Sequence, residues 1–191
     1  MTRSIIFLWI IVSLLSVWPE RSDAAGPWKA QIVDTETGKP LEGVVVLAVW
    51  RHCGFIFMDG CGEYYDAEEV VTGSDGRFVI QARWNPFRTI LGPDLTIFKP
   101  GYGRWRFQGS QDWPKDLYER KARVQKAWEQ FESEGVVIEL PPVKTREERL
   151  DSLRYAGPSA LVPRDRTRHL EEAIDQERVY LGLPRMYGGK P

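Results

Sequence analysis

The sequence has little histidine, little cysteine and no excess of either charge. Of its 191 residues only two are histidine and two are cysteine, and 26 basic side chains nearly balance 27 acidic ones. The balanced charge argues against a nucleic-acid-binding protein, which needs a net basic surface. The two histidines, His52 and His169, lie far apart in the sequence, and no motif connects either one to a serine nucleophile. A His-Glu-x-x-His motif and a glycine-rich phosphate loop ahead of a helix are also missing. The sequence therefore predicts no catalytic residue, no cofactor and no metal site.

Long apolar runs are missing too, except near the N-terminus. Residues 5–18 form an uncharged run that is shorter than the ~20 residues needed to span a bilayer. Ser22 and Ala24 then supply small residues at the −3 and −1 positions of a signal peptidase site. Residues 1–24 are predicted to be a signal peptide cleaved after Ala24, which makes residues 25–191 periplasmic or secreted. An uncleaved N-terminal anchor is the alternative, and no later run is long enough for a second span.

Seven short segments between residues 28 and 140 have the patterns of β-strands. Residues 28–34 alternate apolar and polar side chains, whereas residues 43–50 are almost wholly apolar and β-branched, as expected of a central strand. The other five segments are residues 64–72, 77–82, 95–99, 102–107 and 136–140. Residues 73–76 contain an Asp-Gly pair and predict a hairpin turn between the third and fourth strands. The sequence thus predicts a mainly β fold, a seven-stranded antiparallel β-sandwich of immunoglobulin-like type.

A helical insertion is predicted at about residues 115–134, before the last strand. Its apolar residues fall on one side of a helix and are expected to pack on the sandwich. They are Leu117, Val124, Trp128 and Phe131. The other faces carry both charge signs, which argues against a helix lying on a membrane surface.

The last fifty residues are predicted to be helical. Thr145 and Glu148 have the spacing of a capping box, which places a helix start at this point. A second helix is expected from about residue 165 to residue 181. The chain is accordingly divided into a β-sandwich domain at residues 25–142 and a C-terminal helical extension at residues 143–191.

Cys53 and Cys61 are the only cysteines of the chain. In an oxidising compartment they are expected to form a disulfide that closes a short loop. Metal binding is the competing interpretation, but two cysteines without a histidine at zinc-like spacing support it weakly.

Three blocks of the sequence, in chain order, resemble the carboxypeptidase regulatory-like domain family. They are residues 32–46 (IVDTETGKPLEGVVV), 70–78 (VVTGSDGRF) and 95–102 (LTIFKPGY). The resemblance covers roughly residues 28–107, with residues 136–140 as the last strand. It implies a transthyretin-like seven-stranded sandwich, a module often appended to exported proteins and rarely catalytic. A fold of this type also supports hydrolysis of oxidised urate, but the histidines and the Tyr-Arg-Gly-Ser terminus of that enzyme are missing here.

Acidic side chains gather near the cysteine loop. They are Asp59, Glu63, Asp66, Glu68 and Glu69. Carboxylate oxygens are calcium ligands, but the spacing of a calcium loop is missing, so a solvated edge is the favoured interpretation. On a strand, Asp66 and Glu68 would share one face and Glu69 would point away from it.

Aromatic residues form two clusters with different expected roles. Trp105 and Phe107 share one face of a strand and are expected in the core. Trp84 lies in a loop between arginines, where an exposed ring can stack on a sugar or anchor a protein partner; a core plug is the alternative. The candidate binding residues are Arg83, Trp84, Phe87 and Arg88.

These observations predict a non-enzymatic exported accessory protein that binds or organises another protein of the cell envelope. The alternative is a carbohydrate-binding module of the envelope that uses the aromatic residues around Trp84. A hydrolase that depends on His52 or His169 is a third and weaker possibility.

Overall fold

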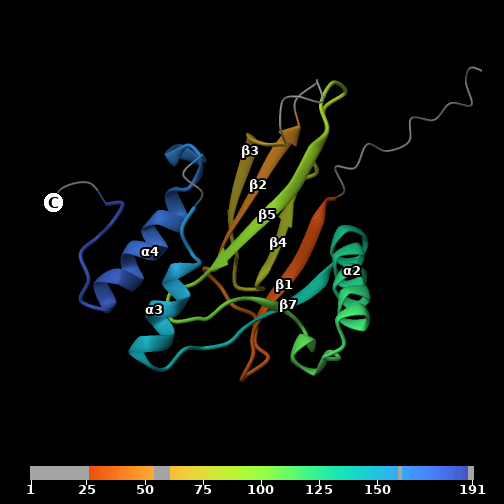
Figure 1. Cartoon of the computed structure of the whole chain (residues 1–191). Helices are drawn as coiled ribbons and strands as arrows, with labels where there is room; N and C mark the ends of the chain where they lie inside the picture. The colour runs from red at the N-terminus through yellow and green to blue at the C-terminus, as the bar shows by residue number, and fades with distance from the viewer. Residues whose placement is uncertain (1–25, 54–60, 159–160, 189–191) are drawn as a thin grey trace, which may run out of the picture.

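The computed structural model describes residues 26–53, 61–158 and 161–188, so the predicted signal peptide lies outside the described residues. This part of the chain is mainly β, with seven strands in two sheets and three α-helices (Figure 1). One sheet has the order β4 (Arg77–Ile80), β1 (Trp28–Asp34), β7 (Val136–Leu140), β6 (Arg106–Phe107). The other has the order β3 (Cys61–Val71), β2 (Val45–Cys53), β5 (Ile90–Phe98). Among the described residues, no helix is both long and apolar enough to cross a membrane.

The pairing of β1 with β7 departs from the predicted antiparallel arrangement. These two strands are parallel, with Ile32 opposite Ile138, while the other four strand pairs are antiparallel. The reason lies in the helix that precedes β7. This helix ends at Ser133, and Gly135, just after it, lies against Lys29 near the start of β1. The chain therefore enters β7 at the end where β1 begins, and both strands run the same way.

The turn at residues 73–76 forms, but the predicted hairpin is wrong. Gly76 has a positive φ of 68° and donates its N–H to the carbonyl of Gly73. However, β3 pairs with β2, and β4 pairs with β1 in the other sheet. The buried hydroxyl of Thr72 donates to the carbonyl of Leu41 and accepts the N–H of Val44, which holds the chain where it leaves β3, beside the start of β2. The turn therefore carries the chain from one sheet to the other.

Strand β2 is buried on both faces, which explains its unbroken apolar sequence. Val46, Ala48 and Trp50 belong to a hydrophobic cluster that also contains buried side chains of the four-stranded sheet. The alternate residues of β2, Val45 and Leu47 among them, belong to a second cluster on the opposite face. Full burial of each such aliphatic side chain contributes about 1.5–3 kcal/mol.

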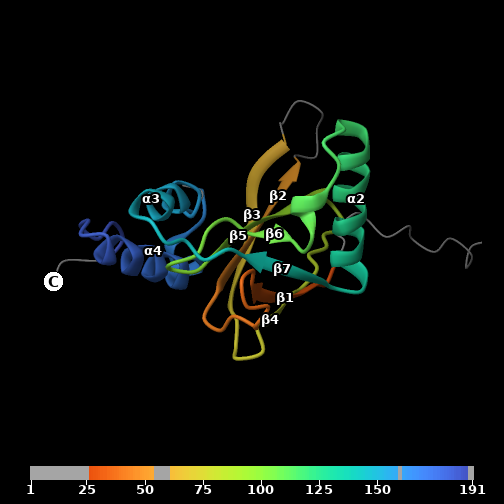
Figure 2. The ribbon, with the colours of Figure 1, turned by 90° about the horizontal axis from the view of Figure 1, so that it is seen from below.

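The C-terminal helices α3 (Arg146–Arg154) and α4 (Arg168–Tyr180) cover this second face of β2. Buried Leu170, Ala173 and Ile174 of α4 complete the second cluster. Figures 1 and 2 show α3 and α4 on one side of the strands and α2 (Leu117–Ser133) on the other. The predicted capping box of Thr145 and Glu148 is confirmed at the start of α3. The helical extension is thus part of the folded body.

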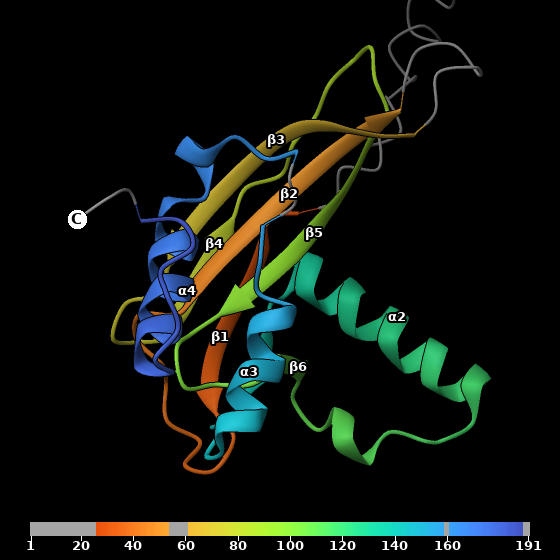
Figure 3. The ribbon, with the colours of Figure 1, turned by 60° about the vertical axis from the view of Figure 1, so that its left-hand side comes forward.

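Helix α2 packs through its C-terminal half only. Phe131 is fully buried, with its ring centred 6.1 Å from that of Phe78 and 6.3 Å from that of Phe107. Trp105 lies edge-on to Phe107 at 5.5 Å, so both rings are in the core region as predicted. Leu117, in contrast, is 68% exposed, and its predicted packing is wrong. The first turns of α2 extend beyond the strands, as Figure 3 shows.

Candidate functional site

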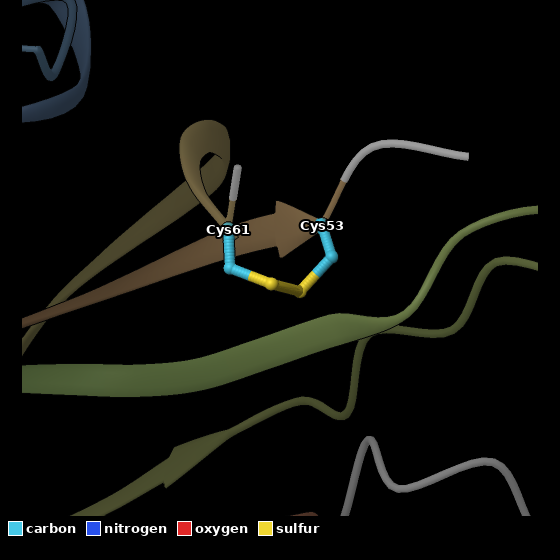
Figure 4. Close-up of a disulfide and its surroundings, with 2 residues drawn as sticks. All are labelled: Cys53 and Cys61. Atoms are coloured by element: carbon cyan, nitrogen blue, oxygen red, sulfur yellow. A yellow bond between two sulfur atoms is a disulfide. The ribbon is translucent and has the colours of Figure 1, made fainter. Parts of the chain in front are cut away.

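The segment between β4 and β5, residues 81–89, contains the predicted binding residues; we call it the aromatic loop. It ends beside the predicted disulfide, which is confirmed: Cys53 at the end of β2 is bonded to Cys61 at the start of β3 (Figure 4). The N–H of Cys53 donates to the carbonyl of Thr89 at 3.0 Å. This hydrogen bond fixes the end of the aromatic loop to the disulfide-linked end of the sheet.

Arg83 anchors the beginning of the aromatic loop. Its guanidinium donates to Asp66 at 2.6 Å and to Glu68 at 3.0 Å, and lies 4.5 Å from the ring centre of Trp50. Because charge-assisted hydrogen bonds to two carboxylates are strong and geometrically specific, the base of the loop has a defined position. The guanidinium of Arg83 is therefore engaged by Asp66 and Glu68 of the same chain and does not face a partner.

The acidic residues of β3 are distributed as their alternation predicts, and Glu63 is solvated, but Asp66, Glu68 and Glu69 are half-buried and do not form a solvated edge. Asp66 and Glu68 share one face as part-buried partners of Arg83. Glu69 points away and accepts the first N–H groups of α4, those of His169 and Leu170, at 2.8 and 2.7 Å. Asp59 lies outside the described residues. Among the residues that are described, no group of three or more histidine, cysteine or acidic side chains is placed to hold a metal ion.

Trp84 and Phe87 form the exposed tip of the aromatic loop. Their side chains are 64% and 76% exposed, so neither is a core plug. The backbone between them is held by Asn85, whose Oδ1 accepts the N–H of Phe87 at 2.9 Å. Such an Asx turn stabilises a tight loop without help from distant residues. The two rings are thus presented to solvent from an ordered backbone.

Arg88 is exposed, but its guanidinium reaches the buried imidazole of His52. Its Nη1 is 2.8 Å from His52 Nε2, and Glu63 Oε2 is 3.5 Å from the same nitrogen. A guanidinium only donates hydrogen bonds, so Nε2 of His52 is the acceptor in its contact with Arg88. Nδ1 is buried and has no hydrogen-bond partner in the described part of the chain. His52 therefore positions Arg88, while His169 lies on α4 and does not reach this site.

Sequence reasoning identified the exposed rings but not the side chains that hold the loop. The predicted disulfide could have indicated His52, because pairing Cys53 with Cys61 sets the β2–β3 register that brings His52 opposite Glu63. Nothing in the sequence indicates that Arg88 meets His52, since the two residues are 36 positions apart.

The site presents two aromatic rings from a loop that is attached at both ends. Arg83, Arg88 and Thr89 bind groups on neighbouring strands, and Asn85 closes the tip. A surface that is already ordered loses little conformational entropy on binding. In comparisons with known proteins, no family model, no curated protein and no solved structure matches this chain.

Proposed function

We propose that this chain is a non-enzymatic binding protein that attaches to another protein through Trp84 and Phe87. The observation that carries the proposal is the exposure of these two large rings, 64% and 76%, on a loop held by internal ion pairs and hydrogen bonds. Tryptophan is among the residues that dominate protein interfaces, and an ordered loop presents it at low entropic cost.

The fold that we propose is a transthyretin-like β-sandwich of the carboxypeptidase regulatory-like kind. Its support is the hydrophobic cluster to which both sheets contribute, with Ile32 and Ile80 from one sheet and Val46 and Trp50 from the other. Alternate residues of each strand enter this cluster, as in two sheets packed face to face. The three sequence blocks that resemble the family occur in the family's order.

The place of action that we propose is the cell envelope. The apolar run at residues 5–18 followed by small residues supports export, and the Cys53–Cys61 disulfide is a bond that persists in oxidising compartments. The partner is accordingly another exported or envelope protein, and the bound chain is an accessory to it.

A carbohydrate ligand is the second candidate, favoured by the open face that an exposed Trp84 offers for stacking. Sugar recognition also needs free polar groups around the ring, because each hydroxyl that loses water must find a partner. The polar neighbours of Trp84 are already committed: Arg83 to acidic residues of β3, Arg88 to His52 and Asn85 to the backbone of the loop. The site thus favours a protein surface over a glycan.

The experiment is cross-linking in intact cells, followed by affinity purification and mass spectrometry, on the native chain and two variants. Trp84→Ala/Phe87→Ala removes both rings, and Met186→Ala is a control because Met186 is as exposed as Trp84 but lies in the C-terminal segment. We expect one envelope protein near stoichiometry with the native chain and the control. We expect the double variant to bind it at least about 30-fold more weakly, the effect of losing one strong aromatic contact.

Two other results would contradict the proposal. If cell-wall glycan is recovered with the native chain but not with the double variant, the aromatic loop binds carbohydrate and the second candidate is correct. Recovery of the same partner by the double variant would show that the aromatic loop is not the binding surface. Since both rings are exposed, the melting temperature of the double variant should match that of the native chain, which separates loss of binding from loss of folding.

A further inference from the structure

The N-terminal half of α2 makes no packing contact that buries it. All nine residues from 115 to 123 are exposed, and they include Leu117 at 68% and Tyr118 at 85%. Residues 115–126 are called here the α2 overhang. Leu117 and Val124 lie on the same helical stripe as Trp128 and Phe131, which pack into the core. The packing stripe of α2 therefore continues past the body of the protein, where Val124 is half-buried and Leu117 is left uncovered by the described residues.

The α2 overhang is strongly basic although the chain as a whole is not. It contains five cationic and two acidic side chains. The cations are Lys115, Arg120, Lys121, Arg123 and Lys126. None of them takes part in an ion pair with another described residue. The rest of α2 carries two glutamates and no cation, so the charge is segregated along the helix.

Helix stability does not explain this placement. Cations near a helix N-terminus oppose the macrodipole, and a short helical segment without tertiary packing is marginal in water. The start of α2 instead depends on Asp116, whose side chain accepts the N–H groups of Tyr118 and Glu119. The cap keeps this basic, partly apolar segment helical although it is not packed, and the surface is thereby kept in place for contact with a second molecule.

We infer that the α2 overhang is a docking surface for an acidic segment of a partner protein. Leu117 and Val124 line an open groove of about 680 Å³, with Arg120 and Lys121 at its sides. This pattern suits a segment that offers an apolar side chain between carboxylates, which pair with the flanking cations. The surface lies on α2 and does not depend on the aromatic loop or on the function proposed for it.

Two other occupants fit the overhang less well. A second copy related by a two-fold axis on this face would bring the same five cations together, and like charges oppose such a contact. A lipid surface requires a long apolar face, whereas Trp128 and Phe131, the largest apolar residues of α2, are committed to the core. An acidic protein segment satisfies both the charge and the small apolar area.

The test places the photo-cross-linking amino acid p-benzoylphenylalanine at Tyr118 of the full chain in intact cells. We expect an adduct with one protein, and the cross-linked peptide of that protein should be acidic. Replacing three overhang cations, in Arg120→Gln/Lys121→Gln/Arg123→Gln, should lower the adduct yield about tenfold or more. A matched variant also removes three exposed cations but lies elsewhere, and it should leave the yield unchanged. It is Lys144→Gln/Arg154→Gln/Arg168→Gln.

Each other outcome overturns the inference. These outcomes are the lack of any adduct, an adduct whose yield does not respond to the overhang charges, and a cross-linked peptide that is not acidic. An adduct with a second copy would assign the surface to self-association. If the purified protein sediments with vesicles of phosphatidylglycerol and phosphatidylcholine and the triple overhang variant does not, the α2 overhang is a membrane-binding surface. Unchanged melting temperatures of both triple variants would show that folding is not the cause of any loss.

Discussion

The substitution Arg149→Met should destabilise the whole protein because it breaks a buried ion pair between α3 and α4. The carboxylate of Glu177 is only 2% exposed and accepts from Arg149 Nη1 at 2.9 and 3.1 Å. It also accepts the N–H of Gly101, in the turn after β5, at 3.0 Å. Glu177 therefore connects both C-terminal helices to the sheets, and Arg149 is its only counter-charge among the described residues.

The expected loss follows from the burial of the pair. Removing one partner of a buried ion pair costs about 3–5 kcal/mol, since the other charge is left without compensation. The Arg149 side chain is 18% exposed, so some water reaches the site, and we expect about 2–4 kcal/mol. Arg149→Met/Glu177→Gln should recover at least about half of this loss, because the amide is uncharged and still accepts from Gly101.

The assay is urea unfolding followed by two signals that report different regions. The six tryptophans that follow the predicted signal peptide all precede residue 129, so their fluorescence reports the sheets and α2, while far-ultraviolet circular dichroism also reports α3 and α4. We expect both transitions of Arg149→Met to move together to lower urea. Arg154→Met, in an exposed pair on the same helix, should stay within about 0.5 kcal/mol of the native chain. A shift confined to the helical signal would refute the reasoning, since the extension would then unfold on its own.

Three further perturbations test the core, the tail and the loop. Phe131→Ala removes a fully buried ring and should cost about 3–5 kcal/mol in urea unfolding; a loss below about 1 kcal/mol would contradict the packing of α2. Burial alone would raise the pKa of Asp175, but hydrogen bonds from the backbone N–H groups of residues 186–188 outweigh it and hold the pKa below its ordinary value. This stabilisation is present above the unfolded pKa of about 3.9 and is lost as pH falls through the folded value, so Asp175→Asn should cost about 1–3 kcal/mol at pH 7 and converge with the native chain in acid. Cys53→Ser/Cys61→Ser opens a loop with a sequence separation of 8 and should cost about 2–3 kcal/mol, measured as a lower melting temperature.

Local signals in the sequence predicted local structure well. The strands at residues 28–34 and 136–140 and the capping box at Thr145 are confirmed, because alternation and capping depend on neighbouring residues. Strand pairing depends on distant residues, and there the sequence failed: an Asp-Gly turn sets a bend, not the partner of the next strand. β5 begins at Ile90 rather than at residue 95, and as an edge strand it accommodates the Gly92-Pro93 pair.

The candidate site also combines features that neighbouring residues determine with features that distant residues determine. The exposure of Trp84 and Phe87 agrees with a loop rich in turn residues, which the sequence shows directly. The internal partners of Arg83 and Arg88 lie on β3 and β2, and only the assembled sheet brings them together. For the same reason the sequence placed Leu117 in the packed stripe of α2, since helical periodicity cannot tell where the body of the protein ends.

The double burial of β2 also constrains how the chain can fold as it is made. A nascent chain emerges from its N-terminus, and the face of β2 that carries Val45 and Leu47 is complete long before Leu170 and Ile174 exist. Until then the sheet presents an uncovered row of β-branched and aliphatic side chains, the kind of surface on which unfinished chains aggregate. A chain ended at residue 142 should therefore accumulate as insoluble protein. If the chain is exported as we propose, this delay gives a reason for chaperones to hold it unfolded until its last fifty residues have crossed the membrane.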